Sequence, residues 1–324
     1  MDRRRVLILA AFLPACARQA FAQSGKMYRI GLLETSAANA NRANLEALLR
    51  GLREAGYVEG KNLVIDYRSA DGRLDRFPEL AGDLVRAHPD VILARGSVAT
   101  LAAKKAGVIP IVMTSSADPV GAGLVANLGK PGGSVTGLSS FVSELHAKQL
   151  ELLKQLVPNI TRFAVIFNMG NPAVPTQRAH IERAASALGM KPLFLDARDR
   201  DGLRRALDMA VAEGAKALID ASPEVSTANR RMTIDLAAMH KLAVFANGRD
   251  YTEAGGLISY GVHYADLYYR AASYVDKILK GAKAGDLPIE QPTRFELVIN
   301  LKTARSLGIS VSRDLLLRAD AIIE

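Results

Sequence analysis

This 324-residue sequence lacks the residues that would build a metal site or a disulfide framework. Cys16 is the only cysteine, so no disulfide can form within the chain and no thiolate cluster can hold a metal. The five histidines show neither H-x-x-x-H nor H-x-H spacing, the usual local metal motifs. We therefore expect no bound metal, surface or capping roles for the histidines, and a fold held together by its apolar core.

Catalytic and cofactor-binding motifs are also missing. The sequence contains no G-x-S-x-G nucleophile elbow and no Walker phosphate loop. The segment 121–126 comes closest to a G-x-G-x-x-G dinucleotide fingerprint, but it has no third glycine and does not follow the first predicted strand. We therefore expect no cofactor and a protein that is not an enzyme.

Positive charge is in modest excess and is not concentrated in one region. Lys and Arg total 42 against 33 for Asp and Glu, which gives a net charge of +9. Residues 1–22 hold four of these arginines and one aspartate, so their removal would lower the net charge to +6. Beyond them we find no dense basic block and no alternation of basic with aromatic residues. The excess predicts a solvated surface and not a nucleic-acid interface.

Long apolar runs are absent, and a short one stands near the N-terminus. Three arginines at 3–5 precede the apolar segment 6–13, which is too short to span a bilayer and is typical of an export signal. Residues 20–22, Ala-Phe-Ala, fit a cleavage site, so we expect removal of residues 1–22 and a periplasmic protein. The alternative is a lipobox-like stretch at 13–16, which would leave the protein anchored through a lipidated Cys16.

The chain does contain 49% hydrophobic residues, arranged as short apolar runs that alternate with segments of helical periodicity. The runs lie at 28–33, 63–67, 91–94, 109–113, 163–167, 193–195, 217–220, 242–245 and 257–261. Such alternation predicts parallel sheets with helices on both faces. A break in the series near Ser139 divides it into two halves, so we expect an α/β protein of two doubly wound parallel-sheet lobes.

Four regions follow from this division. We expect the signal peptide at 1–22, lobe 1 at 27–139, lobe 2 at 140–260, and a segment at 261–324 that returns to lobe 1 and ends in a tail. Phe295, Leu297 and Ile299 alternate with polar residues, which predicts an edge strand in that last segment. Chain crossings near Ser139, Tyr260 and Pro292 would form a multi-stranded hinge.

Polar residues stand at predicted strand ends in both halves, the place where open α/β sheets bind ligands. Those in the first half are Ser36, Ser97, Thr114 and Ser115. Those in the second half are Asn168, Asp220, Ser222 and Asn247. The first set, with free N–H groups where a helix begins after Arg95, favours a carboxylate, and Asp220 favours an ammonium group. Each residue alone can equally be a helix cap, but the set as a whole predicts a small-molecule site.

Three further residues admit two interpretations. Asp118 before Pro119 favours the start of a helix, because aspartate caps helices well and proline fits the first helical position. Asp118 could instead pair with a ligand ammonium group. Tyr251 and Tyr260 follow the turn at 247–248 and can either stack on an apolar ligand or belong to the core.

Several stretches also resemble a known family when they are taken in order. They are 57–62 (YVEGKN), 121–125 (GAGLV), 130–137 (KPGGSVTG) and 291–304 (QPTRFELVINLKTA). Together with the basic leader, they resemble the TrpX-like family of ABC-transporter substrate-binding proteins over nearly the whole chain after the leader. The resemblance implies a type I periplasmic-binding fold, in which two lobes close on a solute and present it to a membrane permease. Relatives are associated with aromatic or other apolar amino acids, but the resemblance does not fix the ligand.

The leading hypothesis is an exported, monomeric protein that captures a small solute, an amino acid or a related carboxylate, for the inner-membrane permease of an ABC importer. The alternative is a ligand-sensing domain of the same fold that acts on a membrane receptor. A repressor would need a DNA-reading module before the first strand, where this sequence has an export signal.

Overall fold

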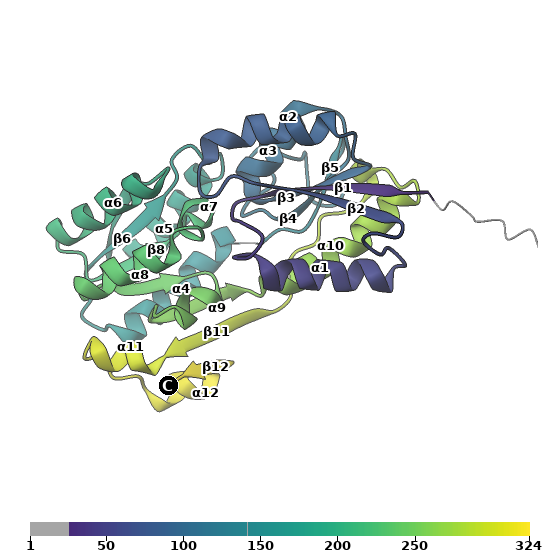
Figure 1. Cartoon of the computed structure of the whole chain (residues 1–324). Helices are drawn as coiled ribbons and strands as arrows, with labels where there is room; N and C mark the ends of the chain where they lie inside the picture. Colours follow the sequence, from purple (N-terminus) through teal and green to yellow (C-terminus); the bar gives the residue numbers. More distant parts are fainter. Residues whose placement is uncertain (1–25, 141) are drawn as a thin grey trace, which may run out of the picture.

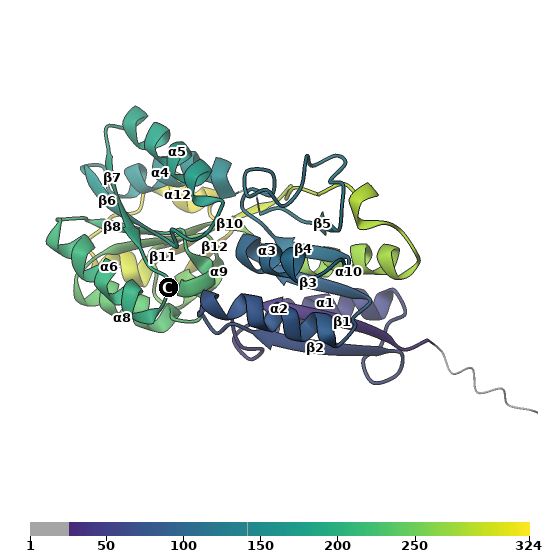
Figure 2. The same cartoon turned by 90° about the horizontal axis from the view of Figure 1, so that it is seen from above.

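The computed structural model describes residues 26–324 except residue 141, and it forms two α/β lobes (Figures 1 and 2). Each lobe has one sheet with helices on both faces. The predicted fold class is therefore confirmed. The predicted signal peptide at 1–22 and Cys16 lie outside the described residues.

Lobe 1 contains a five-stranded, fully parallel sheet in the order β2-β1-β3-β4-β5. Its strands are β1 (Tyr28–Glu34), β2 (Leu63–Ser69), β3 (Val91–Arg95), β4 (Ile111–Ser115) and β5 (Val135–Gly137). Its helices are α1 (Arg42–Glu54), α2 (Phe77–Arg86), α3 (Gly96–Ala106) and α10 (Tyr264–Leu279), with short 3-10 turns η1 (Leu74–Arg76) and η2 (Ala284–Asp286).

Successive residues of the lobe 1 strands face different helix layers. In β3, Val91 and Leu93 belong to the cluster with α1 and α10, whereas Ile92 and Ala94 belong to the cluster with α2 and α3. A parallel sheet covered on both faces needs apolar residues at consecutive positions. This explains why β3 appears in the sequence as an unbroken apolar run.

Lobe 2 contains a seven-stranded sheet in the order β12-β11-β10-β9-β8-β6-β7, in which only the β10–β11 pair is antiparallel. Its strands are β6 (Arg162–Phe167), β7 (Lys191–Asp196), β8 (Ala217–Asp220), β9 (Ala243–Ala246), β10 (Ile258–Val262), β11 (Phe295–Asn300) and β12 (Ala321–Ile323). Its helices are α4 (Val142–Leu156), α5 (Val174–Ala187), α6 (Arg200–Ala212), α7 (Pro223–Ser226), α8 (Arg230–Met239), α9 (Arg249–Glu253), α11 (Leu301–Ser306) and α12 (Arg313–Arg318).

The C-terminal segment 261–324 differs from the expectation. Helix α10 does return to lobe 1, where it packs against α1 (Figure 1). However, β11 and β12 join the sheet of lobe 2, so the prediction that the chain ends in lobe 1 is wrong. The prediction of an edge position for β11 is also wrong, because β11 pairs with β10 on one side and β12 on the other. Leu297 and Ile299 are buried in the lobe 2 core, which holds the strand there.

The chain passes between the lobes three times, after β5, between β10 and α10, and before β11. These crossings lie close to the three positions expected from the sequence. The first and third run side by side, since the Ser139 N–H donates to the Glu290 carbonyl (2.9 Å) and the Glu290 N–H donates to the Gly137 carbonyl (3.0 Å). This paired connection is the hinge between the lobes.

No helix begins at Pro119, contrary to the expectation from Asp118 and Pro119. The Asp118 carboxylate does accept a hydrogen bond from the Gly121 N–H (2.8 Å), as a capping residue would. The chain then makes successive turns, and Gly123 adopts a left-handed conformation with φ of 67°. A left-handed residue five positions after the cap stops helix propagation.

The contact between α1 and α10 generates a test of this packing. A Cβ atom at Gly51 would lie 2.8 Å from both the Ala272 Cβ and the Tyr269 carbonyl oxygen, whereas one at Gly82 in α2 would meet only the flexible end of Arg86, at 3.4 Å. Alanine is favoured over glycine by about 1 kcal/mol in a helix, but overpacking costs about 1 to 3 kcal/mol. We expect Gly51→Ala to lower the free energy of unfolding and the control Gly82→Ala to raise it. Chemical denaturation measures both, and equal stabilisation by the two changes would contradict the close contact.

Candidate functional site

Each sheet has a point where its strand order reverses, between β1 and β3 in lobe 1 and between β6 and β8 in lobe 2. The chain leaves such neighbouring strands toward opposite faces, so a crevice opens at their carboxyl ends. In lobe 1 these strands end at Glu34 and Arg95, and in lobe 2 β8 ends at Asp220. Ionisable side chains therefore stand at both reversal points. The sequence reasoning selected Asp220 but missed Glu34 and Arg95.

A cavity of about 220 Å³ lies between the lobes; we call it the larger cavity. From lobe 1 it is lined by Asn41 and Asn44 near the start of α1 and by Arg95. From lobe 2 it is lined by Asp220 and Asn247, among others. The segment 262–265, the second crossing between the lobes, completes the wall.

A smaller cavity of about 50 Å³ adjoins it. Its polar lining residues are Ser97, Ser115, Ser140, Asn171, Gln177 and Asn247. Asn247 and Tyr264 line both cavities, and consecutive residues divide between them, since Arg95 and Asp220 line the larger cavity whereas Gly96 and Ala221 line the smaller one. The two cavities are therefore neighbouring compartments of one cleft between the lobes.

The lobe 1 wall of the smaller cavity is rich in hydrogen-bond donors. Helix α3 begins at Gly96, whose φ of 80° is a conformation that favours glycine. No side chain caps this helix, so its first N–H groups are available at the wall. The Ser97 hydroxyl lies 2.8 Å from the Ser116 hydroxyl. An uncapped helix start beside hydroxyl groups is suited to an anion such as a carboxylate.

Arg95, which lines the larger cavity, and the nearby buried Glu34 are incompletely paired. Arg95 donates from Nη1 to the Asn41 side-chain oxygen (3.0 Å), and its guanidinium lies over the Tyr264 ring, 5.2 Å from the ring centre. No carboxylate among the described residues lies within 4.0 Å of it. The Tyr268 hydroxyl donates to Glu34 Oε1 (2.7 Å). Burial raises the pKa of Glu34 to about 7, an effect that the charge of Arg95 and the Tyr268 hydrogen bond only partly oppose.

Asp220 is the corresponding buried acid in lobe 2. Its Oδ1 accepts a hydrogen bond from the Ser222 N–H (3.1 Å). Burial raises its pKa, while hydrogen bonds from Ser226 and Ser222 act in the opposite direction. A carboxyl group that is buried without a cation favours its neutral form, and a cationic ligand group would restore its charge.

A chain of buried polar side chains supports the lobe 2 wall. His146 on α4 is fully buried, contrary to the surface or capping role expected, and burial lowers its pKa, which keeps it neutral. Its two ring nitrogens lie 2.9 Å from Gln149 Oε1 and 3.4 Å from Gln177 Oε1. Gln149 in turn donates to Asn247 Oδ1 and to the Tyr260 carbonyl. Two residues that line the cleft, Gln177 and Asn247, are thereby held through one histidine.

The structure separates the predicted site residues into three groups. Those that line the two cavities are Ser97, Ser115, Asp220 and Asn247. Asn168 instead lines an outer groove between the lobes, together with Arg73 and Arg198. The buried residues that line neither cavity are Ser36, Thr114 and Ser222.

The structure also places Tyr251 and Tyr260 in different surroundings. Tyr251 lines the larger cavity while it packs into the lobe 2 core. Tyr260 lies in β10 against Phe295 and lines neither cavity. Of these two tyrosines, Tyr251 is the one placed to touch a ligand.

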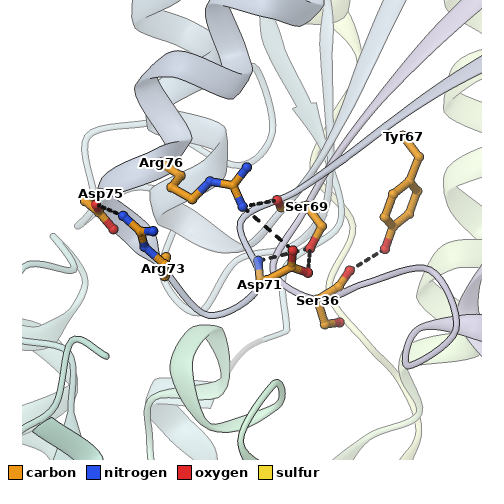
Figure 3. Close-up of polar contacts among 7 residues, drawn as sticks. All are labelled: Ser36, Tyr67, Ser69, Asp71, Arg73, Asp75 and Arg76. Atoms are coloured by element: carbon orange, nitrogen blue, oxygen red, sulfur yellow. Dashed lines mark hydrogen bonds and ion pairs between the residues drawn. The ribbon is translucent and has the colours of Figure 1, made fainter. Parts of the chain in front are cut away.

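The position of Ser36 shows why a strand-end residue can miss the cleft. Its carbonyl accepts a hydrogen bond from the Tyr67 hydroxyl (2.6 Å), which fixes the turn after β1 (Figure 3). The next turn along the sheet, after β2, is held by Ser69, whose hydroxyl donates to Asp71 (2.6 Å), and by the ion pair of Asp71 with Arg76 (3.7 Å) (Figure 3). In both turns, the polar groups named here stabilise the turn itself.

The lobes touch on both sides of the cleft. A Cβ atom at Gly72 of lobe 1 would lie 3.1 Å from the Ala228 Cβ of lobe 2. At the other side Ala122 of lobe 1 shares an apolar cluster with Ala173 of lobe 2. The cleft is therefore closed over its two cavities.

This closed, two-lobed arrangement agrees with comparisons to known proteins. The family model described as ABC transporter substrate binding protein matches residues 30–323. The chain belongs to this family. The resemblance seen in the sequence is thereby confirmed.

Among relatives of this substrate-binding protein, a tyrosine-binding protein from Clostridioides difficile (strain R20291) is 27% identical over 265 residues, which cover 82% of this chain and 76% of that protein. A crystal structure of a conserved domain protein from Vibrio cholerae is 30% identical, with a TM-score of 0.85 and coverage of 92% of this chain and 100% of that chain.

Two further structures match this chain, one with a bound ligand and one without. A Streptococcus pneumonia ABC domain in complex with L-Trp, 24% identical, has a TM-score of 0.84 and covers 92% of this chain and 100% of that one. A ligand-free, open substrate-binding protein from Clostridium difficile, 25% identical, has a TM-score of 0.63 with coverage of 92% and 99%. At nearly equal identity, this structure superposes less well on the ligand-free, open form than on the L-Trp complex.

Two negative findings apply to the described part of the chain. None of its helices is long and apolar enough to cross a membrane. Within residues 26–324 apart from 141, no three His, Asp or Glu side chains gather in a way that could hold a metal ion.

The buried Glu34 generates a test of stability against pH. Its pKa is about 7 in the folded protein and 4.5 ordinarily, so between these values the unfolded chain has lost a proton that the folded chain keeps. Stability from this group is therefore present below pH 4.5 and is lost as pH rises to 7. The Glu34→Gln variant has no ionisable group here, so its free energy of unfolding does not fall in this way. Relative to the wild type, its free energy of unfolding should rise between pH 4.5 and pH 7 by on the order of 3 kcal/mol. Urea unfolding at pH 4.5 and pH 8 measures this, and an equal difference at both would contradict it.

Proposed function

We propose that this protein is an extracytoplasmic solute-binding protein that captures an amino acid or a related carboxylate and delivers it to the permease of an ABC importer, acting as a monomer. The observation that carries the proposal is the closed cleft, which has anion-binding groups on lobe 1 and the buried acid Asp220 on lobe 2. The names of a tyrosine-binding relative and of a structure in complex with L-Trp support an amino acid as the solute.

The polar groups suggest how such a solute lies. Its carboxylate binds in the smaller cavity, where Ser97, Ser115 and the N–H groups at the start of α3 line the lobe 1 wall. Its ammonium group binds Asp220 across the cleft. A solute held by both lobes binds the closed state more tightly than the open state, and this difference in affinity drives closure.

The first experiment tests binding and the role of Asp220. Calorimetry of the purified protein against the common L-amino acids should reveal one class of tight ligand, which is recovered unchanged. Asp220→Asn removes the charge that pairs with ammonium, so it should weaken binding about tenfold to a hundredfold, or roughly 1.5 to 3 kcal/mol. Asp235→Asn is the matched control, because Asp235 pairs with Arg231 (3.0 Å) on the outer surface of lobe 2. Chemical turnover of the ligand, or equal affinity in both variants, would count against the proposal.

A second experiment tests closure. Small-angle X-ray scattering should show a smaller radius of gyration at saturating ligand than without it, since ligand shifts the population toward the closed state. Ser97→Phe places a bulky ring at the smaller cavity, so this variant should remain folded but lose both binding and compaction. An unchanged radius in the wild type at saturation would contradict a clamp mechanism.

A further inference from the structure

The charged residues of the larger cavity are unevenly paired. Its acidic and basic lining residues are Arg95, Asp220, Arg230, Arg249, Asp250, Glu253 and Glu296. Arg230 pairs with Asp250, and Arg249 pairs with Glu253 (2.7 Å) and Glu296 (3.0 Å). Arg95 and Asp220 are left without an ion-pair partner among the described residues, and they have opposite charges on opposite lobes.

Of the two residues, Arg95 is the costlier to leave without a partner, because its side chain remains charged. It is only 8% exposed, and among the described residues the one hydrogen bond of its side chain goes to the neutral side chain of Asn41. Tyr264 covers one face of the guanidinium, which leaves its N–H edge for a planar partner. Glu34, an acid that acts on it electrostatically, lies beyond ion-pair distance, is engaged by Tyr268 and, with its pKa raised by burial to about 7, favours its neutral form only below that pH. A buried cation without an anion is strongly unfavourable.

Under the proposed function, a neutral amino acid leaves the charge of Arg95 unpaired. Its carboxylate is taken up in the smaller cavity and its ammonium group by Asp220, so nothing reaches Arg95. An aromatic side chain could stack on a guanidinium, which contributes about 0.5 to 2 kcal/mol, but it would leave the N–H edge without an acceptor. A second carboxylate would satisfy that edge with two parallel hydrogen bonds.

We propose that the solute carries a second anionic group that binds Arg95 in the larger cavity, and that the ligand is therefore an acidic amino acid. This inference rests on the proposed function and names its substrate class. Arg95 precedes Gly96 and Ser97 directly, so the two anion-binding positions are adjacent and a short acidic amino acid is long enough to reach both. Each charge of such a ligand has one partner in the cleft.

The test compares acids with their amides, which have nearly the same shape. Calorimetry should show that L-glutamate or L-aspartate binds the wild-type protein at least about tenfold more tightly than L-glutamine or L-asparagine. Arg95→Gln should weaken binding of the acid about tenfold to a hundredfold and leave binding of the amide within about threefold. The preference for the acid should therefore disappear.

Two variants control for charge and folding. Arg42→Gln removes the same charge from an exposed position on α1 that lines neither cavity, and it should keep the wild-type preference. Arg95→Lys keeps the charge but loses the planar edge, so it should retain a reduced preference. Thermal melting establishes that each variant is folded, and if Arg95→Gln does not fold, the wild-type ratio together with Arg95→Lys decides the question.

The outcomes separate this inference from the function on which it rests. Tighter binding of tyrosine, tryptophan or an amide than of the acids would overturn the acidic ligand and leave the solute-binding function standing. A preference for the acid that survives Arg95→Gln would overturn the role of Arg95. Failure of the wild-type protein to bind any amino acid would reject the proposed function and the inference together.

Discussion

The need to cover a parallel sheet on both faces determines where this protein can bind a solute. In lobe 1 the helix after β1 lies on one face and the helix after β3 lies on the other, because each face must be sealed from water. The two strands therefore part at their carboxyl ends, and the residues that end them, Glu34 and Arg95, stand beside the resulting crevice. The same reversal in lobe 2 places Asp220 at its crevice. The site is thus a consequence of core packing.

Under the proposed function, the balance of charge across the cleft couples solute binding to closure of the lobes. Most charged groups of the larger cavity are neutralised by neighbours on their own lobe, such as Arg249 by Glu253. Among the described residues Arg95 and Asp220 have no such neighbour, and each belongs to a different lobe. A ligand that serves both must bring the lobes together, and closure then removes water from groups that are costly to bury alone. Only three chain segments connect the lobes, which is the kind of connection that permits such closure.

A buried polar network supports the lobe 2 wall of the cleft. His146 is neutral and lies between Gln149 and Gln177, and Gln149 holds the side chain of Asn247. Buried polar groups of this kind are stable only when each has a partner, so the network fixes the orientation of the amides that face the ligand. Side chains that are already oriented lose less entropy when a ligand binds.

The sequence by itself determined the α/β class, the two halves and four of the residues that line the cavities, because these depend on local patterns. Apolar runs with polar ends identified Ser97, Ser115, Asp220 and Asn247, all of which line the cleft. Thr114 does not, since a shift of one residue along a strand turns the side chain to the other face. Arg95 was missed because it ends a buried strand and its neighbours come from distant segments, among them Asn41 and Tyr264. Only the tertiary structure decided that β11 and β12 join lobe 2, because strand pairing between segments far apart in the chain is set by the packing of the finished core.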